Sequence, residues 1–425
     1  MKVDMNINVH HLTRVEGHGD IHIKVKKGEL VESRWAVVET PRFFEAMLRG
    51  ISHDMAPVLT SRICGICSIS HTLTSLRAVE KAMRIEVPET ARLLRLLAKH
   101  GETLQSHILH LLFLAAPDFF GTGSVIPLIK SRPEVVVLAL RLKGLGNDIC
   151  DLIAGRTTHP VSLVVGGVSK APSREQLETL KETIGERIQD IRAVVGLFQT
   201  LSMPDFVRET EFVSLKGSNR YPWIGGELVS TDGVVKAEDD YLAMTNEYKE
   251  DFTTSKFAKL SRESFAVGAL ARFNNNYNFL HEKAKEAARI FGLTPVNHNP
   301  FMNNIAQIVE CYHVMLESID IIDRVLEDGC PESICAGYEV KAGEAIGAVE
   351  APRGILYHHY DIDENGIITK ADCVIPTTQN NANIHHDLAE LVKQQIMLGK
   401  SDEDVTRLSE MLVRAYDPCI SCSVH

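Results

Sequence analysis

The sequence predicts a mainly α fold with small β-sheets (α+β), in which a bundle of long helices forms the core and hairpins lie at its edge. Three observations support it: apolar residues recur at helical spacing, two segments alternate apolar and polar residues around tight turns, and 44% of the 425 residues are hydrophobic. We expect one domain over residues 1–425, with an N-terminal hairpin region at about 8–40, a helical core at about 45–330 and a C-terminal hairpin and metal-motif region at about 340–425.

Alternation predicts the first hairpin over residues 20–38, on both sides of Lys27-Gly28. The second is predicted over 354–376 and turns at Asn365-Gly366, a strong two-residue turn signal. Residues 205–240 are polar, contain glycines and show no periodicity. For them we expect a surface excursion between helices.

Helical spacing of apolar residues predicts long helices, which run over segments 88–117, 173–191, 300–322, 382–398 and 402–414. Pro88 suits the first turn of the first helix, because proline lacks the N–H that is unpaired there. Ser173 with Gln176 has the pattern of a capping box ahead of the second helix. His107 and His110 lie on an apolar stripe of the first helix and are expected to be hydrogen-bonded core histidines.

Charge and hydropathy exclude some classes of partner. The formal net charge is −11, and no cluster of Lys and Arg suits a nucleic acid or an anionic membrane surface. No segment reaches the roughly 18 apolar residues that span a bilayer, and the N-terminus lacks an apolar signal core. We therefore expect a soluble, cytoplasmic protein.

Four of the nine cysteines form two C-x-x-C pairs, Cys64 with Cys67 and Cys419 with Cys422, each followed by a histidine. Such pairs are typical of metal ligands, so the fold must bring the two ends of the chain together. Structural zinc, nickel, iron and an iron–sulfur cluster all suit thiolates, and residue type alone does not choose among them. Four thiolates leave excess negative charge, which a cation such as Arg353 could compensate.

Further motifs accompany the cysteine pairs in a fixed order, namely Arg14 to His18, Phe43-Phe44-Glu45, Ser106 to His110 with Ala116-Pro117-Asp118, and Glu350 to Gly354. In this combination the chain resembles the large, catalytic subunit of the nickel–iron hydrogenases, from about residue 8 to its end. It is most similar to the cytoplasmic, multimeric NAD(P)-linked group that includes the sulfhydrogenases. The resemblance implies that family's fold and the reversible, heterolytic splitting of dihydrogen.

By this resemblance, Cys64 and Cys419 would be terminal nickel ligands. Cys67 and Cys422 would bridge nickel to an iron that carries carbon monoxide and two cyanides. The resemblance also implies catalytic or cofactor-contacting roles for six further residues: Glu16 as a proton carrier beside the second cysteine pair, Arg353 over the metals, Asp118 close to Arg353, His71 as a donor to a bridging sulfur, and Pro376 and Thr377 near a cyanide.

A magnesium site is implied as well, made by Glu45, the backbone carbonyl of Cys373 and His425. Carboxylate and carbonyl oxygens suit magnesium, whereas histidine is an unusual ligand. Family precursors lose a short extension after the motif's histidine once nickel is inserted. Because the sequence ends at His425, we expect the mature form.

Electrons need a partner, since the sequence holds no iron–sulfur cluster motif, GxGxxG fingerprint or flavin motif. The resemblance implies an iron–sulfur small subunit and further subunits linked to a flavin, NAD(P) or ferredoxin. Two alternatives remain: a zinc-stabilised binding protein without redox chemistry, and a non-hydrogenase quinone-reductase-like subunit. Members of the second class lack intact cysteine pairs, whereas both pairs are present here.

Overall fold

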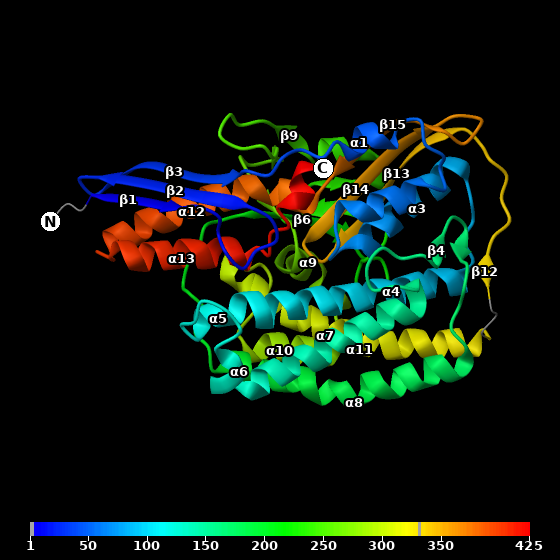
Figure 1. The fold of residues 1–425 in the computed structure, drawn as a ribbon, viewed down its shortest axis with the longest axis horizontal. Helices are drawn as coiled ribbons and strands as arrows, with labels where there is room; N and C mark the ends of the chain where they lie inside the picture. The colour runs from blue at the N-terminus through cyan, green and yellow to red at the C-terminus, as the bar shows by residue number, and fades with distance from the viewer. Residues whose placement is uncertain (1–3, 330–332) are drawn as a thin grey trace.

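The computed structural model describes residues 4–329 and 333–425, and it has a layer of long helices beneath a mixed layer of sheets and helices (Figure 1). The lower layer contains α4 (Glu89–Ile108), α5 (Ala116–Phe119), α6 (Leu128–Ser131), α7 (Pro133–Ala154), α8 (Arg174–Gln199), α10 (Glu282–Ile290) and α11 (Asn303–Glu327). The other helices are α1 (Phe44–Leu48), α2 (Ala56–Thr60), α3 (Ser68–Met83), α9 (Ala269–Asn276), α12 (Pro376–Met397) and α13 (Asp402–Ala415). The predicted fold class, mainly helical with small sheets, is confirmed.

The helix predicted over 88–117 forms, but it changes type partway. After α4, residues Leu109–Ala115 form a π-helix, and Pro117 stands in the first turn of α5 instead of ending the helix. A proline is tolerated at that position because no helical hydrogen bond is required of its nitrogen. The capping box is confirmed: Gln176 N–H donates to Ser173 Oγ, and Ser173 N–H donates to Gln176 Oε1.

Both predicted hairpins form, and each gains a third antiparallel strand. Strands β1 (Met5–Val9), β2 (Gly19–Lys26) and β3 (Glu29–Val37) make one sheet, and β13 (Gly343–Ala351), β14 (Gly354–Ile362) and β15 (Ile368–Val374) make the other. Smaller pairings involve β4 (Leu163–Val164), β5 (Gly167–Val168), β9 (Asn246–Tyr248), β10 (Phe257–Lys259) and β12 (Ile334–Cys335).

The prediction of a surface excursion over residues 205–240 is wrong. This segment supplies β6 (Glu211–Lys216), β7 (Glu227–Ser230) and β8 (Val235–Lys236), and β11 (Phe265–Ala266) joins their sheet parallel to β6. Strand β6 is buried, although its sequence is partly polar. The Glu211 carboxylate is hydrogen-bonded by the N–H and hydroxyl of Ser261, which is why burial of this polar residue is tolerated.

The C-terminal segment pairs with two segments from the first 42 residues of the chain. Glu16 and Cys419 form a parallel β-bridge, and the N–H of Ile420 donates to the Glu16 carbonyl at 2.9 Å. The N–H of Arg42 donates to the Val424 carbonyl at 2.8 Å. These backbone contacts fix the C-terminal segment against the segments on either side of the β2–β3 hairpin. Among the helices of residues 4–329 and 333–425, none has the length and apolar character needed to cross a bilayer.

Candidate metal centre

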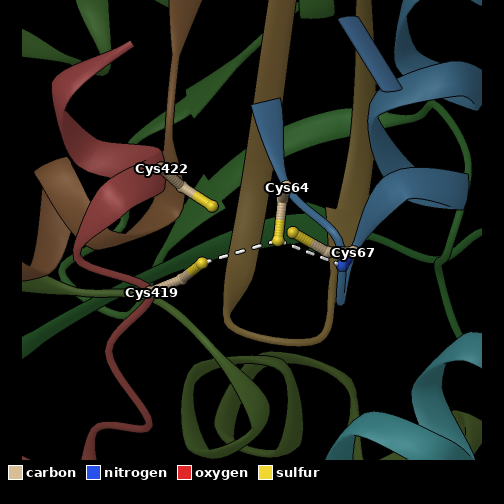
Figure 2. Close-up of side chains that lie close together, drawn as sticks. All are labelled: Cys64, Cys67, Cys419 and Cys422. Carbon is tan, nitrogen blue, oxygen red and sulfur yellow. Dashed lines mark hydrogen bonds between the residues drawn. The ribbon is translucent and has the colours of Figure 1, made fainter. Parts of the chain in front are cut away.

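Two short turns place the four motif cysteines. Cys64 follows a 3-10 turn (Ser61–Ile63), Cys67 precedes α3, and Cys419 and Cys422 lie after α13, the latter in a second 3-10 turn (Ser421–Val424). All four are buried, with Sγ atoms within 4.8 Å of one another (Figure 2). The Sγ atoms of Cys64 and Cys419 are 3.5 Å apart. The fold therefore brings the two distant C-x-x-C pairs together, as the sequence required.

The cysteine thiols of the cluster have pKa values shifted in different directions. Hydrogen bonds from the thiols of Cys419, Cys422 and Cys67 hold the pKa of Cys64 well below its usual range. Burial raises the pKa of Cys422, and hydrogen bonds to Cys422 and Cys64 raise that of Cys419. The protein alone thus stabilises one thiolate in the cluster. A bound metal cation can take all four sulfurs as thiolates, because it stabilises each deprotonated form.

Arg353 supplies a positive charge beside the sulfurs. It is buried and lines a small cavity with Cys67, Cys419 and Cys422. Burial alone would lower the pKa of the guanidinium, but Asp417 and the cysteines keep it well above its usual range. Its Nε is buried and has no hydrogen-bond partner among the described residues. A cation and an unused donor at a four-thiol cluster fit an anionic metal group.

Asp118, expected close to Arg353, is hydrogen-bonded to two other arginines. Its carboxylate accepts hydrogen bonds from Arg14 Nη2 at 2.5 Å and from Arg414 Nε at 2.7 Å. The carboxylate paired with Arg353 is Asp417, whose Oδ1 accepts from Arg353 Nη2 at 2.8 Å. Arg14 and Arg414 occupy both carboxylate oxygens of Asp118, and its closeness to Arg353 stays a prediction.

Three more of the predicted residues line the cavity. Pro376 and Thr377 line it at the start of α12, and the N–H of Cys419 donates to Thr377 Oγ1 at 3.0 Å. His71 lines it from α3, and its Nδ1 lies 3.2 Å from Nε2 of His358. Burial lowers the pKa of His71 to about 4, so its ring is neutral near neutral pH. No hydrogen bond joins His71 to a cysteine sulfur in the described part of the chain.

Glu16 reaches the second cysteine motif from the N-terminal loop. Its Oε2 accepts the N–H of Ser421 at 3.0 Å, and its Oε1 accepts the Ser421 hydroxyl. The carboxylate therefore contacts the residue between Cys419 and Cys422. The role of Glu16 as a proton carrier stays a prediction.

Glu45, Cys373 and His425 form a second polar group. Glu45 Oε1 accepts the N–H of Cys373 at 3.0 Å and lies 3.4 Å from Nε2 of His425. Burial would raise the pKa of Glu45, but the hydrogen bond and charge of His425 and the Cys373 N–H lower it to about 2. The structure therefore brings these three residues together. The group of Cys373 that contacts the Glu45 carboxylate is its backbone N–H, and not its carbonyl.

Sequence reasoning missed three polar residues around Arg353 and His71: Asp417, Ser106 and His358. Ser106 Oγ accepts from Arg353 Nη1 at 3.2 Å. Asp417 stands two residues before Cys419, and the need of Arg353 for a counter-charge was the signal that could have identified it. The histidines expected in the core are confirmed there: His107 Nε2 lies 2.8 Å from Glu310 Oε2, and His110 Nδ1 lies 2.6 Å from Gln307 Oε1.

Comparison with known proteins agrees with this geometry. The profile of the family "Nickel-dependent hydrogenase" matches residues 42–131 and 227–425. Sulfhydrogenase 2 subunit alpha of Pyrococcus furiosus is 35% identical over 99% of both chains. NAD-reducing hydrogenase HoxS subunit beta of Cupriavidus necator is 28% identical over 97% of this chain and 93% of the relative.

Solved structures show the same fold. A crystal structure of NAD+-reducing NiFe-hydrogenase in the H2-reduced state covers 99% of both chains, with 28% identity and a TM-score of 0.89. The NiFeSe-hydrogenase of Dm. baculatum covers 100% of both chains with a TM-score of 0.79, and at 20% identity this likeness concerns the fold. The zinc-stabilised binding protein and the quinone-reductase-like subunit are therefore set aside. With its four cysteines arranged for a metal, the chain belongs to the nickel-dependent hydrogenases, as a large subunit of these oxidoreductases acting on dihydrogen.

Proposed function

We propose that this chain is the catalytic subunit that splits dihydrogen reversibly and heterolytically into protons and electrons. The observation that carries the proposal is the cluster of four buried thiols from opposite ends of the chain. A nickel–iron centre with carbon monoxide and two cyanides on iron would supply a Lewis acid and a redox centre there. The protein holds that centre away from water, balances its charge and carries protons.

We assign Cys64 and Cys419 as terminal nickel ligands, and Cys67 and Cys422 as bridges to iron. The backbone supports these roles. The N–H groups of Ile66 and Cys67 donate to Cys64 Sγ at 3.3 and 3.2 Å, which stabilises it as a thiolate. The Cys67 sulfur lines the same cavity as Cys419 and Cys422, so a second metal would be held on the Arg353 side.

Arg353 is proposed to balance the charge of the thiolates and to orient dihydrogen. Its hydrogen bonds to Asp417 and Ser106 fix the guanidinium, and its unused Nε is available to the reacting group. Thr377 and Pro376 form the wall where a cyanide would lie. We assign His71 the role of holding a bridging sulfur through Nε2, because its Nδ1 is engaged by His358.

Glu16 is proposed to move protons between the thiolates and solvent. Its carboxylate contacts Ser421 directly, beside both C-terminal ligands. A carboxylate is suited to this work because burial and hydrogen bonding can adjust its proton affinity. Glu45, the Cys373 carbonyl and His425 are proposed to hold magnesium, which would tie the C-terminus to α1 and β15.

Electrons are proposed to leave beside the first cysteine motif, towards an iron–sulfur small subunit. Cys64 and Cys67 are buried, but Gly65 between them is exposed, so the surface is near the ligands here. Exposed apolar side chains lie on α1, on α2, at the residue just before each of these helices, and in the loop that contacts this motif: Met47, Val58, Phe43, Met55 and Val161. An apolar partner surface would cover them.

Further subunits would pass electrons to a soluble acceptor such as NAD(P) or ferredoxin. The name of the relative from Cupriavidus necator, an NAD-reducing hydrogenase, supports the first of these. A cytoplasmic location and a single domain over residues 1–425 remain predictions. Identification of the copurifying subunits would distinguish between acceptors.

Metal analysis of the purified complex tests the proposed function. We expect nickel near one per large subunit, iron beyond that of the partner's clusters, and infrared bands of carbon monoxide and cyanide. Zinc in place of nickel, without those bands, would contradict it.

A further inference from the structure

A second group of metal-ligand side chains lies on the N-terminal sheet, apart from the cysteines. It comprises His10, Asp20 and His22, whose ligand atoms lie within 4.8 Å of one another. Asp20 and His22 are two residues apart on β2 and therefore project from the same face. β1 pairs Asn8 with His22, which brings His10 opposite Asp20 on that face.

The group is partly organised for a ligand. Asp20 is largely buried, and its Oδ1 accepts the N–H of His11 at 2.8 Å, while Oδ2 lies 3.3 Å from His10 Nδ1. The ring of His22 is held by a contact of 3.0 Å between its Nδ1 and Asn8 Oδ1. The rings of His10 and His22 meet edge to face, with centroids 5.4 Å apart. Hydrogen bonds of this kind orient the ligands of known metal sites.

Arg34, a cation near this group, is paired with a carboxylate of its own strand. Arg34 on β3 is paired with His22 across the sheet. Its Nε is 3.0 Å from Glu32 Oε1, and its guanidinium lies over the ring of Phe252. Arg34 therefore does not use the negative charge of Asp20. The carboxylate oxygens of Asp20 face the rings of His10 at 3.3 Å and His11 at 3.7 Å.

We propose that His10, Asp20 and His22 form a surface site for a divalent transition metal, with zinc or nickel as the preferred class. Two imidazoles and one carboxylate suit these ions, whereas magnesium and calcium prefer oxygen ligands throughout. Bonds of about 2.0–2.1 Å bring tetrahedral ligand atoms to roughly 3.3 Å from one another, so atoms that lie within 4.8 Å must approach by at most about 1.5 Å. His10 can move, since 66% of its side chain is exposed.

The site lies at the base of the loop that carries Glu16. The N–H of Leu12 donates to the Gly19 carbonyl at 2.9 Å, which closes that loop just inside His10 and Asp20. A metal would join the two strands at this point. The site needs neither the cysteines nor the proposed hydrogenase chemistry, so it can be tested by binding alone.

Equilibrium dialysis of the purified complex against zinc, followed by elemental analysis, tests the proposal. We compare the wild type with His10→Gln and His22→Gln, and use His386→Gln, a partly exposed histidine on α12, as the matched control. The wild type and the control are expected to bind one zinc more than either site variant, or to bind it at least tenfold more tightly.

X-ray absorption at the zinc edge identifies the ligands of that extra ion. We expect nitrogen and oxygen ligands with imidazole scattering. Equal zinc binding by all four proteins would overturn the proposal, and so would a sulfur-rich shell, because the zinc would then lie at the cysteines.

Discussion

Arg353 and Asp417 form a buried ion pair, with Nη2 2.8 Å from Oδ1, at the edge of the four-cysteine cluster. Gln307 Nε2 donates to the other carboxylate oxygen at 3.1 Å. The pair joins the residue proposed to orient dihydrogen to the segment that carries Cys419. Asp417 is thus a positioning residue for Arg353.

Asp417→Asn should lower dihydrogen turnover roughly ten- to hundredfold, because a hydrogen bond between charged groups is worth about 1.5–3 kcal/mol. Asparagine tolerates the left-handed backbone of this position, where φ is 51°. The measurement is hydrogen–deuterium exchange with water, normalised to bound nickel.

Asp118→Asn is the matched control, since this carboxylate pairs with Arg14 and Arg414 instead. It should lower the free energy of unfolding by about 3 kcal/mol and leave the turnover of folded enzyme within about twofold. If Asp118→Asn lost turnover and Asp417→Asn kept it, our assignment of the arginine's partner would be wrong.

Glu16→Gln should keep the metals and block proton transfer, because the amide can accept from Ser421 but cannot carry a proton. Exchange between dihydrogen and deuterated water should then fall by roughly two orders of magnitude or more. Glu39→Gln is the control, since Glu39 lies nearby and accepts from the N–H of His18. Undiminished exchange in Glu16→Gln would remove this residue from the proton path.

Cys422→Ser should prevent assembly of the metal centre, because a hydroxyl cannot replace a bridging thiolate. Nickel per large subunit, measured by elemental analysis, should fall close to zero. Cys311→Ser is the control: Cys311 is equally buried but lies in the apolar interior of α11. Normal nickel, iron and turnover in Cys422→Ser would refute the bridging role.

The parts of the fold that were predictable had strong local signals. The turn at Asn365-Gly366 and the capping box of Ser173 and Gln176 are decided by neighbouring residues, and both form. Helix α3 was missed although Ile69, Leu73, Leu76, Val79 and Met83 recur at helical spacing, because many polar residues lie between them. Nearly all of it is buried, and its hydroxyl residues bond within the helix, as Thr72 and Thr74 do to carbonyls four residues earlier.

The sequence predicted which residue types make the site, but it did not predict which aspartate pairs with which arginine. Two aspartates, Asp118 and Asp417, were each near a motif, and spacing does not determine which one faces Arg353. That choice depends on where Arg14 and Arg414 lie, which is set by packing of the whole chain. The location of Glu16 was recoverable only through the resemblance to a family.

His385 should make the protein less stable in acid. Burial lowers its pKa to about 4, with smaller effects of His386 and Arg34, and its ring stacks on Phe252. The unfolded chain, with a pKa near the ordinary 6.5, binds a proton first, so stability is lost as the pH falls from about 6.5 to about 4.

The His385→Phe variant cannot titrate at this position and should keep the aromatic packing. Its melting temperature should therefore fall less than that of the wild type between pH 7 and pH 4.5. Scanning calorimetry of both proteins at each pH makes the comparison, because their other titrating groups are shared. Parallel losses in the two proteins would contradict a role for His385.

Close packing of α4 on α7 should make Gly101 intolerant of a side chain. A Cβ there would lie 2.8 Å from Ile149 Cγ2 and 2.9 Å from the Gly146 carbonyl oxygen, so the helices would have to separate. Gly101→Ala should therefore lower the free energy of unfolding by about 1–3 kcal/mol.

Gly185→Ala, on the exposed face of α8, is the control. A Cβ there meets nothing within 4 Å, so this variant should raise the free energy of unfolding by about 0.5–1 kcal/mol, because alanine favours helix. Chemical denaturation of both variants measures the two effects. A gain in stability in both would show that helix propensity outweighs the packing of α4 on α7.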